Sequence, residues 1–220
     1  MKIKFFKYLI LSLSILILLI VYLSVIGIET EKFNNQIKDK IFKTNKKFNL
    51  ELKKIKLTLD PINFKINAKT VGATIFYSNR PLSLEYIKTQ ISLASLIKNK
   101  IISSKIEIAT RSILLKDLVK FIRSTNNTPQ LFILETIVNN GYVILNLKLN
   151  YDELGNIKND YQLKGLLKDG EINFLKNNSF KNINFNFNLK KDNYAFEEIK
   201  FTTNKINFFS ELLNIKKKGK

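Results

Sequence analysis

The feature that most constrains this chain is an uncharged, mostly apolar run over residues 8–28, in which Ser12, Ser14, Tyr22 and Ser24 are the polar interruptions. About 20 helical residues cross the hydrocarbon core of a bilayer. The apolar part of a cleavable signal peptide is shorter, about 7–15 residues, and ends in small residues. This run is longer and ends in bulky side chains around Ile26. It therefore predicts an uncleaved transmembrane helix over 8–28, preceded by a basic flank over 1–7.

The charges around this run give two opposing signals for topology. Three lysines precede it and Glu29 and Glu31 follow it, which favours a cytoplasmic N-terminus, because basic residues stay inside. Six lysines between residues 32 and 47 favour the opposite orientation. Long domains are translocated largely regardless of their charge. We therefore expect one membrane crossing and a translocated C-terminal domain.

The residue types in this chain argue against catalysis. It has no His, no Cys and no Trp. It thus lacks the usual general base, thiolate nucleophile and zinc ligands. The acidic pairs Asp152/Glu153 and Glu197/Glu198 are adjacent, and neighbours on a strand point to opposite faces. With 7 Gly and no glycine-rich phosphate motif, the sequence predicts a non-enzyme with no cofactor and no metal.

The net charge of +19 raises the question of a polyanionic partner. Arg, which reads phosphates and bases in a bidentate manner, occurs only at positions 80, 111 and 123. No nucleic-acid motif is present, so we expect no specific nucleic-acid binding. Lysines close to an anionic membrane surface are each attracted by about 1 kcal/mol. The basic charge therefore suits a domain held beside lipid headgroups.

A juxtamembrane amphipathic helix is expected over residues 29–48. Phe33, Ile37, Ile41 and Phe48 fall on one stripe of a helical wheel, and lysines fill much of the remainder. Such a helix can lie in the headgroup layer. It can also pack its apolar stripe on the end of a following sheet. The narrow stripe favours packing on the sheet.

From residue 49 the apolar period changes to two, which predicts strands. The first β-rich section, 49–125, contains an expected bulge at Lys53–Lys54, a strand over 62–68 and a short covering helix at 115–122. The second section, 126–220, consists of a helix and then a β-meander. Thr128 and Pro129 should begin its helix and Gly141 should end it.

Within the meander, Asp169–Gly170 predicts a tight turn, and the last strand is expected to be short, over residues 206–208. These strands have one apolar and one polar face, as antiparallel sheets with one solvated side do. The apolar face needs a cover, and two short helices are too few. Either the sheet folds into a sandwich or it curls into a trough.

The predicted fold is therefore mainly β with a minor α component: a transmembrane helix, then a long antiparallel, curled β-sheet or groove with a few short amphipathic helices. If the groove holds lipid, its candidate contacts are the apolar residues of the second section. They are Val143, Leu145, Leu147, Leu149, Leu163, Leu167, Ile183, Phe185, Phe187, Leu189, Phe196 and Phe201.

Two segments after the helix resemble the N-terminal portion of the AsmA-like proteins of bacterial envelopes, the group that includes AsmA, TamB and YhdP, and a third is similar to the hairpin repeats of the same group. They are LELKKIKLTLDPINFKINAKTVGATIFY, PLSLEYIKTQISLASLIKNKIISSKIEIATRSILLKDLVKFIR and the hairpin run NGYVILNLKLNYDELGNIKNDYQLKGLLKDGEINFL. The resemblance implies a single-pass inner-membrane protein whose periplasmic β-groove carries phospholipid towards the outer membrane. Members of the group are usually much longer than 220 residues.

Two other functions fit the same pattern. One is a lipopolysaccharide-transport component resembling LptC, which also places a β-groove after one membrane anchor. The other is an anchored scaffold with a filled core and no cargo. The expected partners are a membrane lipid, with phospholipid first, and envelope proteins that add a strand to an open sheet edge.

Overall fold

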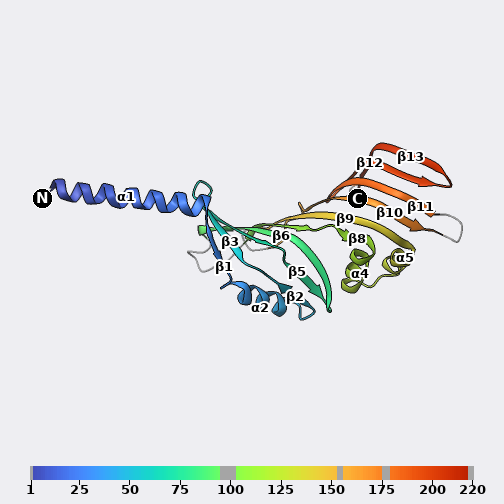
Figure 1. Cartoon of the computed structure of the whole chain (residues 1–220), viewed down its shortest axis with the longest axis horizontal. Coiled ribbons are helices and arrows are strands. Elements are labelled where there is room, and N and C mark those ends of the chain that lie inside the picture. Colours follow the sequence, from blue (N-terminus) through green and yellow to red (C-terminus); the bar gives the residue numbers. More distant parts are fainter. Residues whose placement is uncertain (1, 95–102, 153–155, 175–178, 218–220) are drawn as a thin grey trace.

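The computed structural model describes residues 2–94, 103–152, 156–174 and 179–217, and it consists of an N-terminal helix followed by one extensive antiparallel sheet (Figure 1). Helix α1 (Lys2–Val25) contains the 20-residue stretch Phe6–Val25, which has a mean hydropathy of 2.7 and no buried side chain. This helix is long and apolar enough to span a membrane.

Three further helices are described: α2 (Asn34–Thr44), α4 (Leu115–Thr125) and α5 (Pro129–Ile137). The described strands are β1 (Ile28–Thr30), β2 (Phe48–Glu51), β3 (Ile55–Asp60), β4 (Lys65–Val71), β5 (Thr74–Tyr77), β6 (Arg80–Ser92), β7 (Ser103–Thr110), β8 (Ile113–Leu114), β9 (Val138–Asn150), β10 (Gln162–Asn173), β11 (Ser179–Lys190), β12 (Asn193–Thr203) and β13 (Ile206–Lys216).

The strands form one sheet in the order β1-β3-β4-β6-β7-β9-β10-β11-β12-β13, while β2, β5 and β8 pair beside this path. All pairs are antiparallel. The prediction of a mainly β, antiparallel fold behind an apolar helix is confirmed. The sheet is not curled into a trough, however, and β1 and β13 stand at opposite ends of its strand order.

Several local predictions were wrong where the chain changes partners. The expected bulge at Lys53–Lys54 is a break between two strands, since β2 pairs with β5 whereas β3 pairs with β1 and β4. The strand expected from residue 62 begins at Lys65, and Ile62 and Phe64 lie in the turn before it.

Two glycines of the second section also act differently from the prediction. Gly141 does not cap a helix but lies inside β9, where a Cβ would come within 2.9 Å of the Gly170 Cα. Asp169–Gly170 is not a hairpin turn, because β10 continues through it with a shift in register against β11 and a left-handed φ of 52° at Asp169. Both glycines therefore permit close approach of neighbouring strands.

The core consists of two clusters on one side of the sheet. The first joins Leu50, Ala73 and Leu84, and Ile37 of α2 packs against it. The second joins Leu118 of α4 with Val143, Leu167 and Ile183. The juxtamembrane helix thus packs on the sheet, as expected, although it is shorter than residues 29–48.

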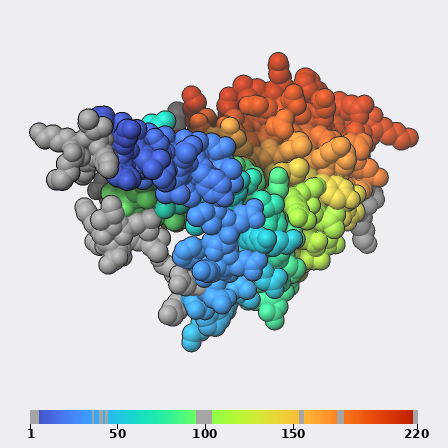
Figure 2. Space-filling model, turned by 60° about the vertical axis from the view of Figure 1, so that its left-hand side comes forward, coloured from blue at the N-terminus to red at the C-terminus, as the bar shows by residue number. Residues whose placement is uncertain are grey.

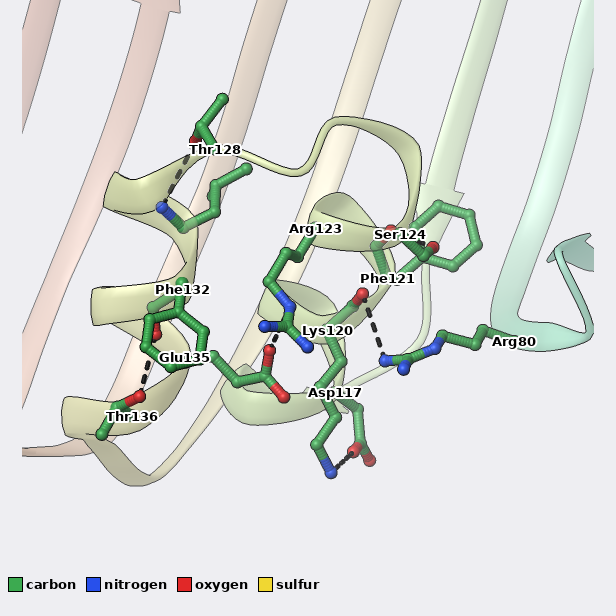
Figure 3. A network of polar contacts seen from close by, with 11 residues as sticks. Arg80, Asp117, Lys120, Phe121, Arg123, Ser124, Thr128, Phe132, Glu135 and Thr136 are labelled. Carbon is green, nitrogen blue, oxygen red and sulfur yellow. Dashed lines mark hydrogen bonds and ion pairs between the residues drawn. The ribbon is translucent and has the colours of Figure 1, made fainter.

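Helices α4 and α5 are fastened to one another by polar contacts (Figure 3). The Arg123 Nε lies 2.6 Å from a carboxylate oxygen of Glu135, and the Arg123 guanidinium stacks over the Phe132 ring at 5.5 Å. Thr128 caps α5 by accepting a hydrogen bond from the Leu131 amide, as its sequence predicted. This helical pair covers the end of the sheet that lies away from α1 (Figure 1).

Candidate functional site: an open apolar sheet face

Apolar side chains align in register across the whole width of the sheet. Residues that face each other on neighbouring antiparallel strands share one face. One such row runs through all ten strands of the main path: Thr30, Ile55, Thr70, Ile87, Ile108, Leu147, Leu163, Leu189, Tyr194 and Ile215. The row starts on the strand that follows α1 and ends on the opposite edge, so one face is mainly apolar from edge to edge.

The twelve residues predicted to contact lipid all belong to this face, but their surroundings differ. Val143, Leu167 and Ile183 are buried under α4. Half-buried side chains that pack against this core are Leu145, Phe185, Phe187 and Phe201. Half-buried side chains outside both core clusters are Leu147, Leu149, Leu163, Leu189 and Phe196. Only this last group lies on a part of the face that the core leaves uncovered.

The uncovered part lies towards α1. Strand β1 leads away from α1, and strand direction alternates along the order of the sheet, so β9 runs back towards the α1 end. Its first half, around Val143, is covered by α4, whereas Leu147 and Leu149 follow nearer α1. An apolar molecule leaving the vicinity of α1 would therefore meet the uncovered part of the face before the covered part.

Aromatic rings extend the apolar face towards β13. The Phe185 ring contacts the rings of Phe187 and Phe196, with centroid distances of 6.0 Å and 5.8 Å. The Phe201 ring stacks on Phe208 of β13 at 4.9 Å. Such rings provide much apolar area at a small cost in conformational freedom.

Strand β13 is much longer than the sequence pattern predicted. It was expected to end at residue 208 but continues to Lys216 and pairs with β12 along its length. Its side chains are exposed on both faces, including Phe209 and Leu212. It forms one margin of the molecule (red, Figure 2), and its outer edge is open to a further strand.

The opposite face is mainly polar and basic, although Ile144 and Leu166 pair on it. One row across it contains Lys56, Lys69, Lys88, Glu107 and Lys148. A shallow hollow of about 380 Å³ opens there, with Lys56, Lys69, Lys88 and Lys105 in its lining. Within the described residues, no group of three or more His, Cys, Asp or Glu side chains could hold a metal ion.

A hydrogen-bonded trio stabilises this polar face. The Tyr86 hydroxyl donates to Glu107 at 2.7 Å, and the Asn146 amide donates to both, at 2.9 Å each. Desolvation and the Glu107 carboxylate raise the pKa of Tyr86 to about 12. Burial raises the pKa of Glu107, but the hydrogen bonds from Asn146 and Tyr86 and the nearby lysines outweigh it, so the net pKa lies below its ordinary value.

Replacing Tyr86 with phenylalanine should lower the free energy of unfolding by about 1 kcal/mol at neutral pH, since hydrogen bonds to Glu107 and Asn146 are lost. A depressed carboxyl pKa gives stability above the unfolded-state pKa of about 4.3, and this stability is lost as the pH falls through the folded value. The variant should therefore differ from the parent less at pH 3 than at pH 7. Urea unfolding of the full chain in detergent measures this, with the exposed Tyr142→Phe as control. An equal difference at both pH values would contradict it.

Comparisons of the chain with protein-family models, with curated proteins and with solved structures found no match in any of the three. The structure itself defines the class. This is an antiparallel β-sheet protein with an N-terminal helix long enough to cross a membrane and one sheet face that is mainly apolar.

Proposed function

We propose that this chain is a membrane-anchored, non-enzymatic lipid-binding protein that accepts acyl chains along its apolar sheet face and passes lipid, with phospholipid first, across the bacterial envelope. In this proposal α1 crosses the inner membrane and the sheet lies in the periplasm. The observation that carries the proposal is the mainly apolar row that crosses the sheet from β1 to β13, with Thr30 and Thr70 as its two hydroxyl-bearing threonines. Its half-buried members between the α1 end and α4 offer apolar surface to an acyl chain on the face itself.

Charge supports a membrane position for the sheet. Lysines crowd the polar face, so anionic headgroups are attracted to the domain while acyl chains lie on the other side. The open edge of β13 adds a possible partner in the same proposal, since another envelope protein can extend the sheet by one strand.

Photo-crosslinking tests the lipid site in intact cells. Leu163 and Lys164 are neighbours on β10 and point to opposite faces. With a benzophenone amino acid at position 163 of the full chain, made in a Gram-negative host, we expect a phospholipid adduct, and with the same group at position 164 we expect none.

The other outcomes separate the alternatives. A lipopolysaccharide adduct at position 163 would favour the LptC-like function. Adducts with protein at position 163, without lipid, would favour the anchored scaffold. Equal lipid labelling at both positions would overturn the role of the apolar face.

A further inference from the structure

The turn between β3 and β4 carries two large apolar side chains that the protein leaves uncovered. Ile62 is 88% exposed and Phe64 is 70% exposed. The turn is nevertheless ordered by polar contacts, because both carboxylate oxygens of Asp60 accept hydrogen bonds from Asn63, at 3.0 Å from its amide and 2.9 Å from its side chain. These hydrogen bonds hold the pKa of Asp60 below its ordinary value. A fixed turn thus presents Ile62 and Phe64 outwards.

Phe64 is also an unfavourable residue for its backbone conformation. Its φ of 50° lies in the left-handed region, which Gly and Asn adopt much more readily than a bulky residue. The Phe64 carbonyl accepts a hydrogen bond from the Leu93 amide at 2.9 Å, which holds the backbone in place. Since the ring is 70% exposed, contacts with the described part of the chain do not account for a phenylalanine here. Such strain points to a contact outside the chain.

The position of the turn identifies what it contacts. Strand β3 runs antiparallel to β1 and therefore back towards α1, and Gly27 abuts Leu57 and Thr58 so closely that a Cβ would lie 2.3 Å from the Leu57 carbonyl oxygen. The strand continues beyond Thr58 through Leu59 and Asp60, roughly 7 Å at 3.3–3.4 Å per residue, before it turns. The turn therefore projects back alongside α1.

The C-terminal end of helix α1 is partly covered on the side that meets β3. Of its last two turns, only the side chains Ile20, Leu23 and Ser24 are partly covered. They stand at i, i+3 and i+4, on one helix face, and Ile20 lies about 10 Å before Gly27 along the axis. Figure 1 shows the β3–β4 turn beside this end of α1, and α1 contacts β3.

We propose that the β3–β4 turn is a second membrane contact, in which Ile62 and Phe64 enter the bilayer interface beside α1. This inference rests on the proposed membrane anchor. With Phe6–Val25 across the hydrocarbon core, the last turns of α1 lie at its boundary, where apolar side chains gain by leaving water. The turn would fix the tilt of the sheet over the membrane and hold the uncovered apolar face near the lipid surface.

Tryptophan fluorescence tests this contact without background, because the chain has no Trp. The full-length Phe64→Trp variant is reconstituted into vesicles of phosphatidylcholine and phosphatidylglycerol, with and without brominated acyl chains. We expect blue-shifted emission that brominated lipid largely quenches. Ile62→Trp should behave in the same way. Phe209→Trp, on the exposed edge strand β13, serves as control and should emit as in water.

Each remaining outcome decides the inference. If the chain floats with the vesicles but both turn reporters emit as in water, the membrane contact is wrong while the anchor stands. If the emission shifts to the blue without lipid quenching and depends on protein concentration, a second protein covers the turn, and the inference is overturned. If the chain does not float with vesicles at all, the proposed anchor fails together with the inference.

Discussion

Leu147→Asp is expected to abolish the binding of lipid to the sheet. Leu147 stands in the middle of the apolar row, in register with Ile108 and Leu163. Removing a leucine contact costs about 1.5–3 kcal/mol, and an ionised carboxylate under an acyl chain adds a desolvation penalty. A loss of about 1.4 kcal/mol is tenfold in an equilibrium constant. Lipid labelling by a benzophenone group placed at Leu189, two strands away, should therefore fall at least roughly tenfold.

The control for this prediction introduces the same charge on the other face. Lys164→Asp changes an exposed side chain on β10, beside Leu163, and should leave lipid labelling at position 189 unchanged. Circular dichroism of both full-length variants in detergent confirms that the sheet is intact. Unchanged lipid labelling at position 189 in Leu147→Asp, or an equal fall in both variants, would contradict the proposal that lipid lies along this row.

The residues of this row were predictable because their faces follow from local sequence. Strict alternation of apolar and polar residues over 145–149 and 183–189 fixes which side chains share a face, whatever the strands pair with. Helix α4 was predictable for a similar reason, since Leu115, Leu118, Val119 and Ile122 have helical spacing. Where one face of a strand or helix is buried and the other is solvated, the spacing of its apolar residues therefore predicts both the type of element and its buried face.

The predictions were wrong where the same spacing of apolar and polar residues fits two different local structures. Strand β13 is exposed on both faces, so nothing imposes a period of two on pairs such as Phe208–Phe209. Asp169–Gly170 suits a hairpin turn and a bulge equally, and the pairing of β10 with both neighbours selects the bulge. Alternation placed Ile62 and Phe64 on a strand face, but the Asp60–Asn63 hydrogen bonds make a turn there.

The open form of the sheet could not be predicted from the sequence either, because curling depends on the relative twist of many strands. An alternating pattern is the same for a sandwich, a trough and an open sheet. The cover supplied by α2, β2 and β5 at one place and by α4 at another comes from long-range packing. The sequence could therefore identify the candidate face but not which part of it stays uncovered.

Gly27→Ala is expected to destabilise the fold much more than Gly72→Ala, although both glycines have nearly the same backbone conformation. Their φ angles are 73° and 69°. A left-handed conformation costs an L-residue about 1–2 kcal/mol, which applies to both positions. At Gly72 an added Cβ meets only the ends of the Arg111 and Lys53 side chains, at 3.4 Å, and these can move. At Gly27 it meets the Leu57 carbonyl oxygen at 2.3 Å, so the backbone of β1 must separate from β3.

Thermal unfolding of the two full-length variants in detergent separates strain from steric clash. Gly72→Ala should lower Tm by the backbone term alone, about 2–8 °C for a chain of this size. Gly27→Ala should lower it further, since each β1–β3 hydrogen bond lost removes about 1 kcal/mol. Amide exchange in β1 and β3 should accelerate in Gly27→Ala only. Equal Tm shifts and unchanged exchange would mean that α1 is not seated on β3, and the depth assigned to the β3–β4 turn beside the membrane would then lose its structural basis.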